Sequence, residues 1–146
     1  MRAFSLVEMI VVLAIVVLAL AAAWPAMSRF QFDTQVNEGL AMLAMDLRLA
    51  ASDSRAAWQN SGYGLKFDQD YYTVYRGDNY AARQTEFDRV VRLDGALRFE
   101  LGLAPSANEI SFDHRGLPRS FGSVTIDRVG LVGKGLVINK LGVIEK

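Results

Sequence analysis

The chain has 146 residues, enough for one domain of ordinary size, and 51% of them are hydrophobic against 22% charged. This composition excludes intrinsic disorder. Sixteen basic residues balance sixteen acidic ones, so no overall positive field draws the chain to nucleic acid or to an anionic membrane surface. The sequence has no cysteine, which excludes disulfides, zinc–thiolate sites and cysteine nucleophiles.

The hydrophobic residues are concentrated near the N-terminus. Twenty residues from Met9 to Ser28 carry no formal charge, and at ~1.5 Å per helical residue they cover about 30 Å, the thickness of a bilayer core. We therefore predict a transmembrane helix over residues 4–28. A removable secretory signal is the alternative. Glu8 argues against it, because an acid at the edge of the hydrocarbon costs about 2.5–3.5 kcal/mol and needs a partner.

The helical pattern continues beyond this segment, over residues 29–59. Apolar or small residues recur at steps of three and four, at Val36, Leu40, Leu43, Leu47, Ala50, Ser54 and Trp58. The opposite face is predicted to be polar, with Asp33, Glu38, Asp46, Arg48, Asp53 and Arg55. Together the two segments predict one long helix that is amphipathic in its second half. Pro25 lies inside this helix and is expected to kink it.

Residues 60–146 alternate between apolar and polar positions and predict a small antiparallel β-sheet. The predicted strands are Tyr63–Phe67, Tyr71–Arg76, Arg89–Leu93, Leu97–Leu101, Glu109–Phe112, Ser123–Asp127 and Leu136–Asn139. Turns are predicted at residues 68–70 and 113–116, and a mobile loop at residues 77–87. The apolar sheet face should pack on residues 36–47 of the helix. This arrangement predicts an α+β fold in which residues 29–59 and 60–146 form one domain.

The run from Phe4 to Ile10, followed by an aliphatic helix, resembles the class III signal of type IV pilins and of the pseudopilins of type II secretion. The resemblance implies that residues 1–3 are a leader, that a prepilin peptidase cleaves between Ala3 and Phe4, and that the new Phe4 amine is methylated. Ala3 stands where the family overwhelmingly has glycine. Glu8 would be the fifth mature residue and would set subunit register in assembly. Pro25 falls where many pilins carry a helix-kinking proline.

Three later segments are similar to the minor pseudopilins and minor pilins of the GspH/FimT type. They are Leu43–Ala50, Ile110–Gly116 and Gly135–Ile144. This resemblance implies a structural subunit of a short periplasmic filament, or of its tip complex, that drives protein export. Its expected partners are the lipid bilayer, other pseudopilins or pilins, the prepilin peptidase, an inner-membrane assembly platform and secreted cargo. The protein would sit in the bacterial inner membrane with its N-terminus cytoplasmic and its head periplasmic.

The sequence offers few side chains that could form a catalytic site. The sole histidine, His114, lies in a predicted turn and has no second histidine or cysteine to work with. Asp68 and Asp70 form a D-x-D pattern that usually serves turn chemistry, so we expect no metal and no cofactor. A single-pass periplasmic protein that never polymerises is one alternative function.

The other alternative is a DNA-binding minor pilin. The last part of the sequence has a local excess of positive charge, and the residues that would contact DNA are Arg115, Arg119, Arg128, Lys134 and Lys140. The family's terminal arginine pair is replaced by Val143 and Glu145, which dilutes the positive charge where a phosphate-binding cluster should be densest. We therefore favour scattered surface charge over a DNA site.

Overall fold

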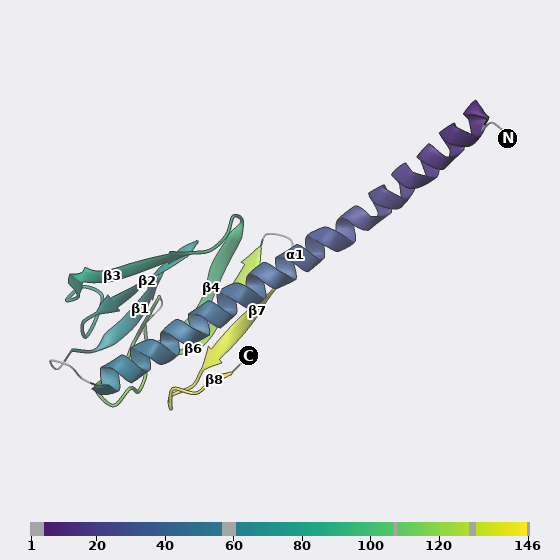
Figure 1. Ribbon diagram of the computed structural model, residues 1–146. Helices are drawn as coiled ribbons and strands as arrows, with labels where there is room; N and C mark the ends of the chain where they lie inside the picture. Colours follow the sequence, from purple (N-terminus) through teal and green to yellow (C-terminus); the bar gives the residue numbers. More distant parts are fainter. Residues whose placement is uncertain (1–4, 57–60, 107, 129–130, 146) are drawn as a thin grey trace. The chain divides into compact units, whose positions relative to one another are not determined.

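The computed structural model describes residues 5–56, 61–106, 108–128 and 131–145, without the side chains of residues 23–26 and 131–132. Within these residues one helix, α1 (Leu6–Ala56), precedes eight strands (Figure 1). The predicted α+β class, a long N-terminal helix with antiparallel β-structure, is confirmed. The chain divides into two compact units, an N-terminal unit of residues 1–35 and a head unit of residues 36–146, and α1 contributes to both.

Helix α1 begins where its first free N–H groups find an acceptor. The carbonyl of Ser5 accepts hydrogen bonds from the backbone N–H groups of Glu8, at 3.0 Å, and Met9, at 3.2 Å. The helical assignment runs without a break through position 25, so the predicted kink at Pro25 stays a prediction. The described helix ends at Ala56 with Arg55 in its last turn, where a cation suits the helix dipole. The rest of the predicted helix, including Trp58, lies outside the described residues.

The strands form two four-stranded antiparallel sheets in the head unit. The first sheet has the order β3-β2-β1-β5 and consists of β1 (Tyr63–Phe67), β2 (Tyr71–Arg76), β3 (Gln84–Arg92) and β5 (Glu109–Ser111). The second has the order β4-β6-β7-β8 and consists of β4 (Leu97–Ala104), β6 (Phe121–Arg128), β7 (Leu131–Ile138) and β8 (Ile144–Glu145). The sequence pattern predicts a single sheet. It cannot show the division, because β4 leaves its neighbour in sequence, β3, and pairs with the distant β6.

The structure corrects the predicted loop over residues 77–87. Strand β3 begins at Gln84, which pairs with Arg76 across an irregularity in the β2–β3 register. The turn before it is anchored by Arg83, whose guanidinium donates to Asp88 at 2.7 Å and stacks 3.8 Å from the centre of the Tyr80 ring. These contacts fall between side chains that show no periodicity in the sequence, which is why the pattern predicted a loop there. The turn predicted at residues 68–70 is confirmed, with the Asp68 N–H donating to the Tyr71 carbonyl at 2.9 Å.

The core of the head unit forms where the predicted apolar face of α1 meets both sheets. Figure 1 shows the C-terminal part of α1 lying along strands of both sheets. On the helix, the buried apolar residues of the head unit include Val36, Leu40, Leu43, Leu47 and Ala50, as the periodicity predicts, and also Ala44, which it does not. The sheets contribute Leu65, Phe67, Tyr72, Tyr75, Leu97, Ile110, Phe112, Val124, Ile126, Leu136 and Ile138. At about 1.5–3 kcal/mol for each large side chain buried, this shared core is the main source of stability.

An aromatic cluster joins the two sheets. Phe99 of β4 lies with its ring centre 5.4 Å from that of Phe67 and 5.9 Å from that of Tyr72, both in near-perpendicular arrangements. Edge-to-face pairs of this kind are worth about 0.5–1.5 kcal/mol beyond the area they bury. The backbone N–H of Phe99 also donates to the carbonyl of Gln69, in the β1–β2 turn, at 2.8 Å. The cluster therefore ties the outer edge of β4 to the first sheet.

Asp46 is not on the exposed polar face where the sequence pattern placed it. Its side chain is only 8% exposed. Its Oδ2 accepts a hydrogen bond from the Tyr72 hydroxyl at 2.6 Å, and its Oδ1 pairs with the Arg89 guanidinium at 2.5 Å. Burial and the hydrogen bond to Asp46 both raise the pKa of Tyr72, so this phenol stays protonated and remains a donor at physiological pH. A buried carboxylate is tolerated here because both of its oxygens have partners.

Replacing Tyr72 by Phe should reduce the free energy of unfolding of the head unit by about 1–3 kcal/mol, because Asp46 would lose a partner in a buried site. The measurement is a urea titration of the full chain in detergent micelles, followed by near-ultraviolet circular dichroism. The control is Tyr63→Phe, since the hydroxyl of Tyr63 makes no hydrogen bond with another described residue and its loss should cost little. Equal effects of the two variants would contradict a stabilising role for the Tyr72–Asp46 bond.

Gly116 lets the loop after β5 approach α1. Its φ is +71°, and a Cβ at this position would collide with the Nε of Arg55 and lie 2.7 Å from the Ala51 carbonyl oxygen. Gly95 also has a positive φ, of +56°, but a Cβ there would meet nothing within 4 Å. The two glycines thus share a left-handed backbone and differ in the space around them.

Gly95→Ala should cost about 1–2 kcal/mol of stability from the left-handed backbone alone. Gly116→Ala should cost a further ~1–3 kcal/mol, because the helix and the loop must move apart. Urea titrations of both variants give the difference directly. If the two variants were equally stable, the contact between the loop and Arg55 would not be tight in solution.

Candidate membrane anchor and assembly site

The N-terminal unit exposes large apolar side chains on all sides of the helix. Leu6 is 75% exposed, Leu13 68% and Leu20 66%. Within the part of the chain that the structure describes, α1 is the one helix long and apolar enough to cross a membrane, and none of its most apolar stretch is buried in the protein. A core helix of a soluble protein would cover such side chains with its own domain. The surface of this helix is therefore suited to lipid or to other apolar helices.

Glu8 is placed in the first turn of α1, next to residues that are otherwise apolar. The N-terminal end of a helix carries partial positive charge, which favours an acid there by about 0.3–1 kcal/mol. The side chain is exposed and makes no ion pair or hydrogen bond with any residue in the described ranges. The expected cleavage and methylation site, Ala3 and Phe4, lies outside the described residues. Glu8 is thus available to a partner outside this unit.

The structure divides the predicted DNA-contacting residues between the two ends of the β6–β7 pair. Arg119 precedes β6 and pairs with Asp78 at 3.4 Å, whereas Arg128 ends the same strand. Lys134 lies on β7, where its Nζ is 3.4 Å from Asn37 Oδ1. Lys140 follows β7, and its Nζ lies 4.9 Å from the centre of the Phe121 ring. Residues at opposite ends of an eight-residue strand are separated by about 25 Å, so these cations are not gathered in one cluster.

The fifth residue, Arg115, belongs to a turn in which its positive charge is already paired. Its Nε lies 3.1 Å from Asp113 Oδ2, and the backbone N–H groups of Arg115 and Leu117 both donate to Asp113 Oδ1 at 2.9 Å. Partial burial favours the neutral acid, but the N–H of Leu117 and the Arg115 guanidinium outweigh it and lower the pKa of Asp113. Asp113 is therefore ionised at neutral pH and neutralises Arg115. DNA binding by this surface stays a prediction.

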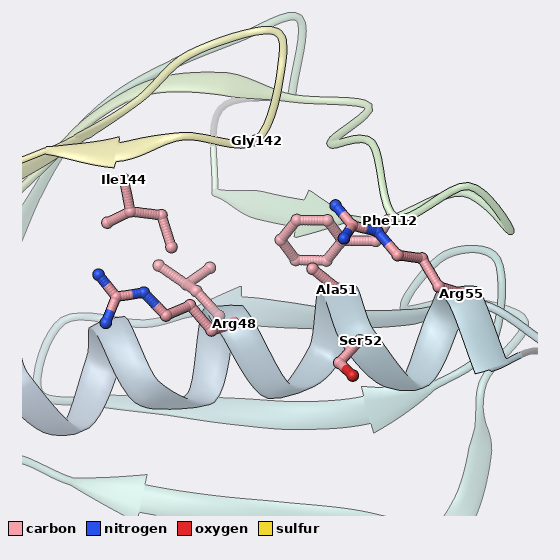
Figure 2. Close-up of a pocket in the computed structure, with 8 residues that line it drawn as sticks. Arg48, Ala51, Ser52, Arg55, Phe112, Gly142 and Ile144 are labelled. Carbon is pink, nitrogen blue, oxygen red and sulfur yellow. The ribbon is translucent and has the colours of Figure 1, made fainter.

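A pocket of about 180 Å³ lies beside α1 in the head unit. Its walls combine helix residues with residues from distant segments, and they are Leu47, Arg48, Ala51, Ser52, Arg55, Phe112, Gly142 and Ile144. Figure 2 shows the side chains of Arg48 and Arg55 rising from the helix, with Ile144 near the first and Phe112 near the second. Ser52 points away from this group in the same view. The floor is thus apolar and the two ends are cationic.

The sequence analysis did not identify this pocket. The spacing of Arg48 and Arg55, two helical turns apart, is visible in the sequence and indicates only that they share one side of the helix. The other half of the site comes from Phe112 and Ile144, more than fifty residues away in the chain. No local pattern links residues so far apart.

Comparisons with known proteins give one match. Residues 1–24 match the model of the prokaryotic N-terminal methylation motif. Neither the curated proteins nor the solved structures provide a match to this chain. The motif implies a substrate of the prepilin peptidase that assembles with other pilins, and the exposed apolar helix is consistent with anchoring in the inner membrane. The motif, followed by a long helix and antiparallel sheets, indicates a type IV pilin-like protein.

Proposed function

We propose that the protein is a minor pseudopilin, a structural subunit of a short periplasmic filament or of its tip complex that drives protein export by type II secretion. The observation that carries this proposal is the methylation motif over residues 1–24, placed directly on a helix whose apolar surface is uncovered. The resemblance of Leu43–Ala50, Ile110–Gly116 and Gly135–Ile144 to the GspH/FimT type supports the finer assignment. In this function the head presents its loops to other subunits or to secreted cargo.

Glu8 provides the negative charge that would pair with a neighbouring subunit during assembly. Cleavage between Ala3 and Phe4 leaves a positively charged, methylated amine close to the membrane boundary. An isolated charge in this environment is costly, whether it is the amine or the Glu8 carboxylate. Pairing the amine of one subunit with Glu8 of its neighbour removes both uncompensated charges, and the low dielectric constant strengthens their attraction. A subunit therefore gains from having a neighbour in the correct register.

The first test is processing. Protein purified from cells that contain the prepilin peptidase should have an intact mass lower by residues 1–3 and higher by one methyl group than protein from cells without it. Mass spectrometry of the N-terminal peptide should place the methyl group on Phe4. An unshortened chain from both cell types would contradict the proposed maturation. Because Ala3 replaces the family's usual glycine, the Ala3→Gly variant provides the matched positive control.

The second test concerns assembly. Glu8→Gln removes the negative charge and keeps the shape, so it should leave membrane insertion intact and reduce the yield of filaments or tip complexes by about tenfold or more, measured by shearing and crosslinking. Glu38→Gln is the matched control, since Glu38 is an exposed acid on the head part of the same helix and its loss should leave the yield unchanged. Undiminished assembly of the Glu8→Gln protein would leave a single-pass anchor that does not polymerise.

A further inference from the structure

The pocket beside α1 has two guanidinium groups that form no ion pair with any acid among the described residues. Arg48 makes no hydrogen bond or ion pair with any described residue. Arg55 uses its Nε to donate to the carbonyl of Arg115 at 3.0 Å, which leaves its two terminal amino groups for another acceptor. Asp113, the acid that follows the pocket residue Phe112, is already paired with Arg115. The site is therefore complementary to an anion.

One of the two cations is held in position before any ligand arrives. The aliphatic part of the Arg55 side chain lies against Gly116. A side chain at position 116 would collide with it. Together with the bond to the Arg115 carbonyl, this contact fixes the side chain at one end of the pocket. A guanidinium that is already ordered loses less conformational entropy when it binds an anion. The geometry is thus that of a prepared acceptor for a carboxylate.

The rest of the pocket selects for an apolar group next to that carboxylate. Leu47, Ala51, Phe112 and Ile144 line it between the two arginines. The volume of about 180 Å³ corresponds to roughly six water molecules and is below the ~300–1,000 Å³ typical of small-molecule sites. A space of this size fits the end of a chain. A terminal residue carries a carboxylate and a side chain on one Cα. Because the chain ends there, the pocket does not need room for a second segment of backbone to leave it.

We propose that this pocket binds the C-terminal residue of a partner polypeptide, with its α-carboxylate held by Arg55 at one end of the pocket and its apolar last side chain directed toward Ile144. Capture of a terminal carboxylate by arginines uses charge-assisted, bidentate hydrogen bonds. Leu141 and Val143, the exposed apolar neighbours of Gly142, extend the apolar surface along the chain next to the site. The binding mode involves only the head unit and does not depend on filament assembly.

The test uses the full chain in neutral detergent micelles and a fluorescent peptide, Gly-Ser-Gly-Ser-Leu, labelled at its N-terminus. Anisotropy should show binding of the free acid, and the C-terminal amide should bind at least about tenfold more weakly, a difference of about 1.4 kcal/mol. Arg55→Gln should weaken binding of the acid by a similar factor, because it removes the guanidinium that holds the carboxylate. Arg48→Gln, at the other end of the pocket, should weaken it less and should not affect the fold, because Arg48 has no bond to any described residue to lose. Arg128→Gln, which removes an exposed arginine at the end of β6, should have no effect.

Three outcomes would overturn the proposal. The first is no binding of the acid, or equal binding of acid and amide. The second is that Arg55→Gln changes nothing, or that Arg128→Gln weakens binding as much. The third is that an amidated peptide with an internal glutamate beside leucine binds as tightly as the free acid, which would assign the pocket to acidic side chains. Circular dichroism of each variant distinguishes a lost ligand contact from a lost fold.

Discussion

The apolar face of α1 is the constraint on which the head depends. The two sheets share this face as a common core: Tyr72 of the first sheet donates to Asp46 of the helix, and Ile126 of the second sheet lies where a side chain at Gly39 would contact it. A sheet with one apolar face must bury that face against another element. A change in Leu40, Leu43 or Leu47 would therefore affect both sheets at once, since all three side chains are buried in the same core.

The same helix meets two different surroundings along its length. In residues 36–56 a stripe of apolar side chains is buried and the remainder is mostly exposed, as expected for a helix between a protein core and water. In residues 6–22 the apolar side chains are exposed around the whole helix, which is stable only in lipid or among other apolar helices. A single acid, Glu8, interrupts that apolar surface. The arrangement combines a folded head with a segment whose side chains find their partners outside the chain.

The arginines of the head fall into two groups, those paired with a nearby acid and those beside the pocket. Most arginines near the loops are neutralised locally, as Arg83 is by Asp88 and Arg115 is by Asp113. These pairs are partly exposed to water, which weakens their attraction, and they reduce the net field of the surface. Arg48 and Arg55 differ because they flank an apolar pocket and have no acidic partner among the described residues. A balanced total charge therefore coexists with a local site for an anion.

The sequence alone predicted the elements that depend on local repetition. The three- and four-residue steps of Val36, Leu40, Leu43 and Leu47 predicted the buried face of α1. The alternation of residues 63–76 predicted β1 and β2 with the bounds that the structure shows. The motif around Phe4 and Glu8 likewise lies within one short stretch, so it could be recognised without a fold. Periodicity and motifs report on neighbours in the chain, and these features involve neighbours only.

Only the tertiary structure decided how distant segments meet. Asp46 lies on the edge between the apolar and polar faces of α1, and the helical pattern alone placed it in water. It is buried because Tyr72 and Arg89, on two strands far along the chain, supply partners for both of its oxygens. The division into two sheets and the pocket between α1 and Ile144 have the same origin. Each depends on contacts between residues far apart in the chain, whose energies come from packing and desolvation. Such contacts produce no periodic pattern in the sequence.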